Sequence, residues 1–158
     1  MIFNQLFDDK SSTYTYIISS GKGREALIID PVIEHTKKYI KILKNLELKL
    51  VKVIDTHIHA DHISGLNELN KQTECTRIMG EESESEVIDL RVKENEKVKI
   101  EGVELITLYT PGHTKCSYSY LMNDRVFTGD TLLINGSGRT DFQGGSAMEQ
   151  YDSIFGKL

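Results

Sequence analysis

The spacing of apolar residues along the chain predicts alternating strands and helices. Three segments rich in β-branched and aromatic residues, each followed by Gly, Pro or Asp, are typical of strands: 13–19, 26–30 and 50–55. Residues 34–48 place lysines on one side of a helix and apolar residues on the other, at Tyr39, Ile40, Leu43 and Leu46. We therefore expect a strand-helix-strand unit in which Val51–Ile54 pairs in parallel within a covered sheet.

The second half of the chain predicts further helices and two hairpins. A helix is expected to begin near His62 and continue to residue 70, and the acidic stretch 81–89 should be exposed. Strands at 97–102 and 103–110 are joined around Gly102, and a hairpin across 118–130 turns at Asn123–Asp124. Residues 146–158 should form a helix with one apolar side, made by Met148, Tyr151, Ile154 and Phe155. This order indicates an α/β layered sandwich.

Composition narrows the class of protein. A length of 158 residues, with 39% hydrophobic and 27% charged residues, predicts one globular domain over 1–158. The net charge of −5 and the lack of a dense Lys/Arg run argue against nucleic acid as a partner. No apolar run reaches the roughly 18 residues that a membrane span needs. Two distant cysteines and an N-terminus without a signal-peptide pattern favour a reducing, cytoplasmic location.

Histidines gather where predicted strands end. Directly after the strand 50–55, the segment DTHIHADH places His57, His59, Asp61 and His62 within six positions. Three imidazoles and a carboxylate so close together are costly to pack without a cation. Nitrogen and oxygen donors of this kind suit Zn, Fe, Mn or Ni. By contrast His35, at the start of a predicted helix and in no motif, is expected to have no ligand role.

Two later strands end in the same way. The strand 103–110 is followed by the rigid turn that carries His113, and the strand 125–130 ends in Asp130. Ligand side chains at three strand ends fit a site built where the strands of an α/β sheet finish.

Taken together, THIHADH, TPGHT and TGDTLL resemble the motifs of the metallo-β-lactamase superfamily. The resemblance implies an αβ/βα four-layer sandwich with metal held in a shallow groove at the edge between two packed sheets. The segment GSGRTDFQGG, residues 136–145, is similar to the GCGRTDFQ signature of the persulfide dioxygenases, the group that includes the ethylmalonic encephalopathy protein.

The persulfide dioxygenase resemblance implies one Fe(II) per chain. Its ligands, and the catalytic centre, would be His57, His113 and Asp130, which form the two-histidine, one-carboxylate set of such iron sites. His59, Asp61 and His62 would then orient the ligands and metal-bound water through hydrogen bonds. The implied reaction oxidises glutathione persulfide, or a related low-molecular-weight persulfide, with O2 to sulfite and thiol.

Arg139 is the candidate for binding the substrate. Its planar guanidinium can pair with a carboxylate of glutathione through two hydrogen bonds. A surface ion pair with nearby Asp141 is the alternative. Cys75 and Cys116 are expected to be small buried thiols, and Tyr118 and Tyr120, two apart on a strand, should pack on the same side.

The chain also departs from the family pattern. Ser137, Cys116 and Gly144 stand where cysteine, glycine and glutamine are frequent, which puts substrate fit in question. Leu158 comes before a late segment that family members carry, so the fold is expected to be C-terminally truncated, through a shortened product or an unusually short member. Exposed sheet edge and apolar surface would favour a homo-oligomer.

Two other functions remain open at this point. One is a zinc thiolester hydrolase of the glyoxalase II kind, which needs two metals and a further late histidine, and no histidine follows His113. The other is a non-catalytic, truncated remnant that keeps the metal ligands. Zinc is therefore the alternative to iron.

Overall fold

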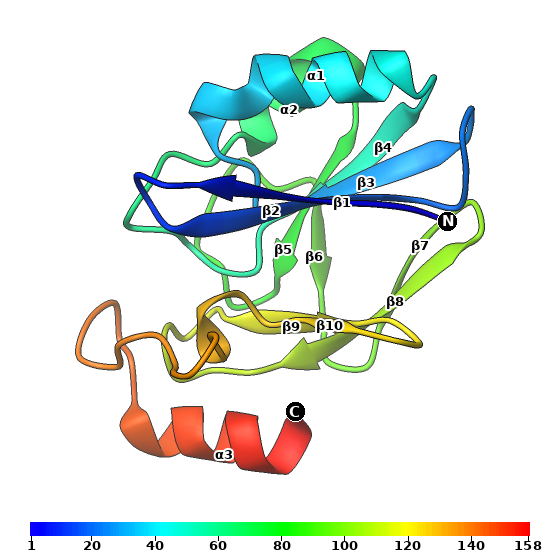
Figure 1. The fold of residues 1–158 in the computed structure, drawn as a ribbon. Helices are drawn as coiled ribbons and strands as arrows, with labels where there is room; N and C mark the ends of the chain where they lie inside the picture. The colour runs from blue at the N-terminus through cyan, green and yellow to red at the C-terminus, as the bar shows by residue number, and fades with distance from the viewer.

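The computed structural model describes residues 1–158 and has four layers: helices, sheet, sheet, helix (Figure 1). The first sheet has the strand order β1-β2-β3-β4-β5-β6. Its strands are β1 (Ile2–Asp8), β2 (Thr13–Ser19), β3 (Glu25–Ile29), β4 (Lys49–Ile54), β5 (Thr76–Gly80) and β6 (Leu90–Val92). The pairs from β1 to β3 are antiparallel, and those from β3 to β6 are parallel. The predicted parallel pairing of Val51–Ile54 is therefore confirmed.

The second sheet is antiparallel and has the order β10-β9-β8-β7. Its strands are β7 (Lys97–Ile100), β8 (Val103–Tyr109), β9 (Tyr118–Leu121) and β10 (Val126–Phe127). The predicted turns are present, because the register of β7 with β8 closes at Gly102 and Met122 N–H bonds Arg125 O across Asn123–Asp124. This sheet carries two of the three candidate ligands.

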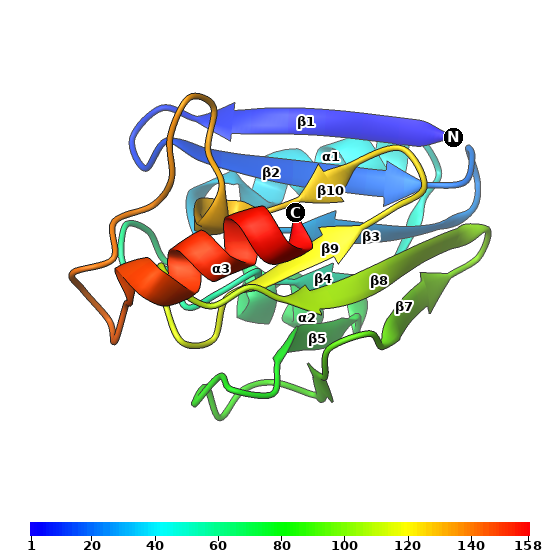
Figure 2. The ribbon, with the colours of Figure 1, turned by 90° about the horizontal axis from the view of Figure 1, so that it is seen from below.

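Helices cover the outer faces of both sheets. Helices α1 (Thr36–Asn45) and α2 (Leu66–Thr73) lie over the first sheet, and α3 (Ala147–Lys157) lies over the second (Figure 2). Two short 3-10 helices, η1 (Ile33–His35) and η2 (Gly129–Thr131), follow β3 and β10. Ser146 caps α3 by accepting a hydrogen bond from Glu149 N–H. None of the helices combines the length and apolar character that a membrane crossing requires.

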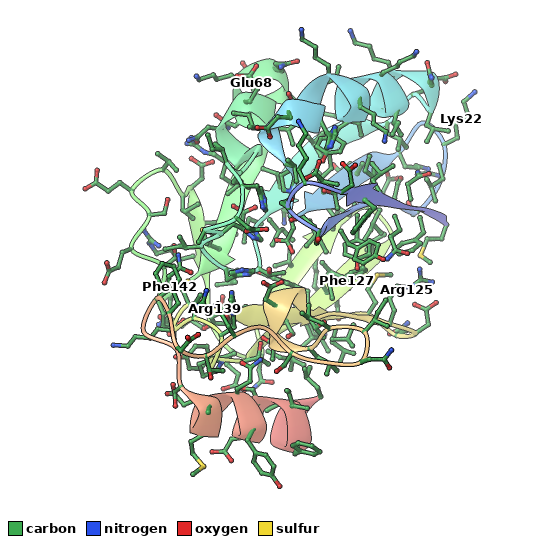
Figure 3. The ribbon with its side chains drawn as sticks, turned by 60° about the vertical axis from the view of Figure 1, so that its left-hand side comes forward. Lys22, Glu68, Arg125, Phe127, Arg139 and Phe142 are labelled. Atoms are coloured by element: carbon green, nitrogen blue, oxygen red, sulfur yellow. The ribbon has the colours of Figure 1, made fainter.

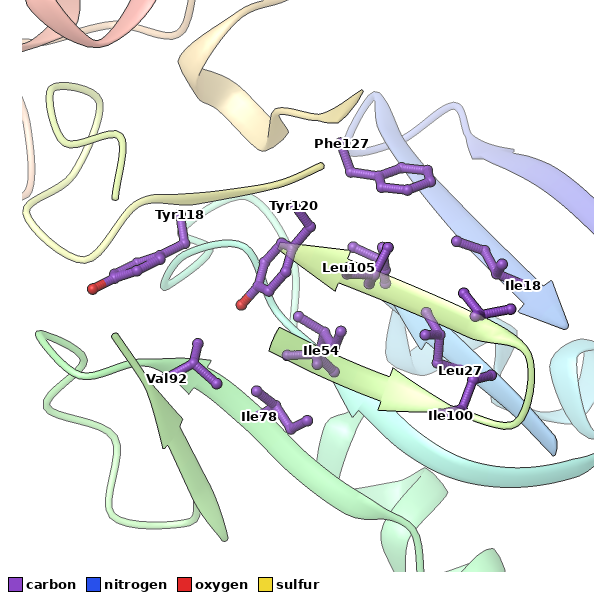
Figure 4. Close-up of a cluster of buried hydrophobic side chains, with 13 residues drawn as sticks. Ile18, Leu27, Ile54, Ile78, Val92, Ile100, Leu105, Tyr118, Tyr120 and Phe127 are labelled. Carbon is purple, nitrogen blue, oxygen red and sulfur yellow. The ribbon is translucent and has the colours of Figure 1, made fainter. Parts of the chain in front are cut away.

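The main core lies between the two sheets (Figure 4). Strands alternate in which face each side chain points to, so Ile18 and Ile29 enter this core while Ile17 and Ile28 point to the helices. Burial on both faces explains the unbroken apolar run 26–29 in β3. Tyr118 and Tyr120 both pack in the core between the sheets, as predicted.

The sequence did not predict three of the strands. Strand β1 is an edge strand whose residues are only half buried in alternation, and Asn4 and Gln5 interrupt its apolar pattern. Strands β5 and β6 are short and depend on pairing with distant strands. The second helix was placed too early: it begins at Leu66, not near His62, because residues 59–62 form a loop in which three polar side chains face one another.

Helix α3 forms as predicted, but its apolar side faces solvent. Met148, Tyr151 and Phe155 are exposed, whereas Gln150 and Ser153 are buried against the loops of the second sheet. Five residues of the acidic stretch 81–89 are exposed, as predicted, whereas Glu82, Ser85 and Ile88 are partly buried and Ser83 is buried. Both cysteines are buried and free, as expected.

Candidate metal centre

Three strand ends deliver one group of candidate ligands. His57 follows β4, His113 follows β8, and Asp130 lies in η2 directly after β10. One donor atom from each of the three lies within 4.8 Å of the others. The structure thus brings together the residues that the sequence analysis selected.

His57 is suited to bind a cation because it is neutral. Burial, followed by the charges of His59 and His113, holds the pKa of His57 well below its ordinary value of 6.5. Its ring lies at 86° to that of His113, with 4.9 Å between ring centroids. An unprotonated ring nitrogen is the form that ligates a metal.

His113 is oriented by the main chain. Its Nδ1 lies 2.7 Å from the carbonyl oxygen of Arg139. A carbonyl can only accept, so Nδ1 carries a proton, and in the neutral ring Nε2 is the unprotonated nitrogen. That Nε2 lies 3.5 Å from Oδ2 of Asp130. Two imidazole nitrogens and one carboxylate fit a single divalent iron, which accepts this donor set.

A second polar group adjoins the first. His59, Asp61 and His62 also offer donor atoms within 4.8 Å of one another. The two groups are neighbours, with 4.1 Å between the ring centroids of His57 and His59. His62 Nε2 is buried and has no hydrogen-bond partner.

His59 differs from His57 in its surroundings. Burial alone would lower its pKa, but the hydrogen bond to Asp30 and the charges of Asp30 and Asp55 outweigh burial and raise the pKa of His59 to about 9. Asp30 was not selected from the sequence. It stands at the end of β3 without any histidine beside it, so only the parallel pairing of β3 with β4 brings it to the site.

Helix α3 holds the loops that carry two of the candidate ligands. Gln150 donates from Nε2 to the carbonyl oxygen of Thr131 at 2.6 Å, and the hydroxyl of Ser153 donates to the carbonyl oxygen of Pro111 at 2.6 Å. Gly112 has φ +142°, and a Cβ there would lie 2.3 Å from Cα of Gln150. No sequence signal distinguishes Gln150 and Ser153 from the other polar residues of this helix.

The side chain of Arg139 pairs with Asp141. Its Nε and Nη2 atoms donate to the two carboxylate oxygens at 2.7 and 3.0 Å, and both side chains are exposed. The guanidinium also lies 5.7 Å from the ring centroid of Phe142, on the loop before α3 (Figure 3). This is the arrangement that the sequence analysis gave as the alternative, and a role in substrate binding stays a prediction.

A cavity of about 560 Å³ opens beside the two polar groups. Asp130, His59 and Asp61 form one wall, and the loop 132–134 and the hairpin of β1 and β2 form the others. Cavities of this size accept small molecules. His35 lies elsewhere, with Nε2 2.7 Å from Oδ1 of Asp8.

Comparison with known proteins decides the family. The sequence model of the Metallo-beta-lactamase superfamily matches residues 8–156 of this chain. This chain belongs to the metallo-beta-lactamase superfamily. Persulfide dioxygenase ETHE1, mitochondrial, of Mus musculus is 38% identical over the whole chain, and that of Homo sapiens is 36% identical. The chain spans 63% of the length of these two relatives.

One solved structure and one further sequence relative also match this chain. The crystal structure of ETHE1 from Myxococcus xanthus matches with a TM-score of 0.97 and 44% identity, covering 100% of this chain and 70% of that one. A probable hydroxyacylglutathione hydrolase of Schizosaccharomyces pombe is 35% identical over 89% of this chain and 56% of its own length. The metallo-beta-lactamase fold is therefore shown, and the chain groups with the ETHE1 persulfide dioxygenases.

Proposed function

We propose that this chain is a persulfide dioxygenase with one Fe(II) bound by His57, His113 and Asp130. The observation that carries the proposal is the convergence of these three side chains in a chain that is 44% identical to the ETHE1 protein of Myxococcus xanthus. Two histidines and one carboxylate occupy one face of an octahedron and leave three positions for substrate and O2.

The reaction is the oxidation of a persulfide, RSSH + O2 + H2O → RSH + H2SO3. Iron bound at this centre would supply a place where the terminal sulfur and O2 meet, which overcomes their slow direct reaction. The protein's own residues orient the ligands and balance the charge of the metal. The carbonyl of Arg139 fixes the ring of His113, the carboxylate of Asp130 offsets positive charge, and His59, Asp61 and His62 orient ligands and water.

Glutathione persulfide is the proposed substrate, with a related low-molecular-weight persulfide as the broader class. The cavity of about 560 Å³ beside Asp130 has room for the thiol carrier. Arg139 would bind one of its carboxylates by exchanging Asp141 for the substrate, because both ion-pair partners are exposed and water screens their attraction.

A second candidate is a zinc thiolester hydrolase of the glyoxalase II kind. The group formed by His59, Asp61 and His62 favours it, since this group could hold a second metal beside the first. Hydroxyacylglutathione hydrolases are also among the relatives. We place the hydrolase second because its relatives are less similar to this chain: a hydroxyacylglutathione hydrolase is 35% identical over 89% of the chain, against 38% over the whole chain for a persulfide dioxygenase.

Metal analysis after anaerobic purification, with assays of O2 uptake and sulfite formation on glutathione persulfide, tests the proposal. One iron per chain and sulfite formation are expected, and both should be lost in His57→Ala. His35→Ala is the matched control, because His35 lies in neither group and should leave the iron in place. Two zincs with hydrolysis of S-lactoylglutathione would support the hydrolase, and a chain with neither metal nor activity would be the non-catalytic remnant.

Self-association and a cytoplasmic location stay predictions. The exposed side of α3, where Phe155 is 74% exposed, offers apolar surface to a second copy. Sedimentation velocity of the chain beside Phe155→Ser tests this, and a monomer at all concentrations would refute it.

A further inference from the structure

Thr56 connects a buried carboxylate to His57. Its main-chain N–H donates to Oδ1 of Asp30 at 2.7 Å, and its hydroxyl donates to Oδ2 of Asp30 at 2.9 Å. The same hydroxyl oxygen lies 2.9 Å from Nδ1 of His57. Asp30, Thr56 and His57 are 4%, 1% and 2% exposed, so water does not compete for these bonds.

The positions of the protons follow from the chemistry of the three groups. An ionised carboxylate can only accept, and a hydroxyl has one proton to donate. Because the hydroxyl proton of Thr56 is directed to Asp30, its oxygen must accept from His57. Nδ1 of His57 therefore carries the ring proton, and Nε2 is the unprotonated nitrogen.

Packing keeps the hydroxyl in this arrangement. A Cβ on Gly129, which has φ +48°, would lie 2.3 Å from Oγ1 of Thr56 and 3.3 Å from Nδ1 of His57, so the main chain of η2 closes over the pair. Tyr118 N–H donates to the carbonyl oxygen of Thr56 at 2.9 Å and fixes its main chain. The hydroxyl has no space in which to exchange its partners for water.

The main chain of Asp30 is fixed by hydrogen bonds, as that of Thr56 is. Its main-chain N–H donates to Ile54 O at 2.8 Å, and the hydroxyl of Thr15 donates to its carbonyl oxygen at 2.7 Å. Its φ of +50° is unusual for a residue other than glycine. Such a main-chain conformation is retained where the surrounding contacts require it. Oδ1 also lies 3.3 Å from Nε2 of His59, so one carboxylate contacts both parts of the histidine motif.

We propose that Thr56 is a positioning residue that selects the His57 tautomer able to ligate the metal, with Asp30 fixing the direction of the Thr56 hydroxyl. This inference rests on the proposed metal centre and not on the persulfide. It explains why a hydroxyl stands between two strand ends: a carboxylate there could accept from His57 directly but would bring a further negative charge into a buried site.

Metal affinity of matched variants tests the inference. Thr56→Ser keeps the hydroxyl, and Thr56→Val keeps the shape without it. The dissociation constant for Co(II) would be measured on the metal-free chain by competition with a chelator. Loss of an outer hydrogen-bond partner typically costs about 10–100-fold in metal affinity, and this is expected for Thr56→Val. Thr56→Ser should stay within about threefold of the wild type, and equal losses in both variants would overturn the inference.

The tautomer itself supplies a second readout, independent of metal and of turnover. Long-range 1H-15N spectra of the metal-free wild type should show His57 protonated at Nδ1, as Thr56→Ser also should. Protonation at Nε2 in the wild type would overturn the inference even if Thr56→Val failed to fold. A chain with this tautomer and this Co(II) affinity, but without sulfite formation, would refute the proposed function and leave the role of Thr56 intact.

Discussion

The main-chain carbonyl oxygen of Arg139 lies 2.7 Å from Nδ1 of His113, while the guanidinium of the same residue pairs with Asp141. One residue thus has two separable roles. The main chain supports a candidate ligand, and the side chain is exposed and free to exchange partners. A substitution of the side chain should leave the bond to His113 unchanged.

Arg139→Ala should therefore retain iron but lose activity on glutathione persulfide. If the guanidinium binds a carboxylate of the substrate, transition-state stabilisation should fall by about 1.5–3 kcal/mol, the usual worth of a hydrogen bond to a charged group. Steady-state kinetics and metal analysis of the same preparation check this. Arg139→Lys should restore little, because a point charge does not reproduce the planar fork.

Two controls separate substrate binding from support of the loop. Asp141→Asn weakens the existing ion pair and should not reduce activity if Arg139 acts on the substrate. A persulfide without carboxylates should show little effect of Arg139→Ala. Equal losses on both persulfides would mean that Arg139 only stabilises the loop.

Asp130→Ala should abolish metal binding more completely than a change in the neighbouring group. Asp130 is the single carboxylate of the proposed ligand set. Its removal should therefore lower metal affinity by more than the roughly 10–100-fold that follows loss of a residue that only hydrogen-bonds to a ligand. Asp61→Ala is the matched control and should still bind about one metal per chain, with lower affinity. Calorimetric titration with Fe(II) under anaerobic conditions measures both, and two tightly bound zincs in the wild type would contradict the prediction.

Acid should remove the stabilisation that Asp8 provides. Hydrogen bonds from the side chain and the main chain of Ser11, then one from His35, lower the pKa of Asp8 from its ordinary 3.8. A carboxyl whose pKa is lower in the folded state stabilises the fold above its unfolded pKa, and loses this effect as pH falls through the folded pKa. Asp8→Asn should thus be less stable than the wild type at pH 7, with a difference that shrinks below about pH 4.

Urea unfolding at several pH values checks this dependence on Asp8. The exposed neighbour Asp9 supplies the control, and Asp9→Asn should change stability little at any pH. A difference between Asp8→Asn and the wild type that stays constant down to pH 2 would show that the charge of Asp8 contributes nothing.

Tyr120→Phe should leave stability unchanged or raise it. The hydroxyl of Tyr120 is buried in the core and has no hydrogen-bond partner, and such a group costs about 1–3 kcal/mol. Tyr39→Phe is the opposite case, because its hydroxyl lies 3.0 Å from Oγ1 of Thr15 and accepts from Val32 N–H at 3.2 Å. Its loss should destabilise by about 0.5–1.5 kcal/mol per bond, and a clear drop in the urea midpoint for Tyr120→Phe would disprove the prediction.

The sequence predicted those strands, helices and turns whose own residues carry a clear periodicity or a turn signal. The strands around His57 and His113, the helix over 36–45 and the hairpin at Asn123–Asp124 have periodicity and turn residues of their own. The edge strand β1 and the short strands β5 and β6 do not, since their stability comes from pairing with distant segments.

The candidate ligands could be selected because each follows a strand, and the ends of β4, β8 and β10 meet where the edges of the two packed sheets come together. The residues that hydrogen-bond to these ligands and to their loops could not be selected from the sequence. Thr56 and Asp30 look like ordinary turn residues in the sequence, and Gln150 and Ser153 look like polar positions of a surface helix. Only the folded arrangement shows that they are buried and directed at the loops of the site.

The bonds of Gln150 and Ser153 to the loops of Asp130 and His113 connect helix α3 to the candidate metal centre. Such a connection acts in both directions. An ion that favours one geometry of the two loops also favours the docked helix, and a docked helix raises the affinity for the ion by the same factor. The docking of α3 against these loops and the binding of metal are therefore coupled equilibria. The concentration of free metal would determine how firmly residues 147–157 are held.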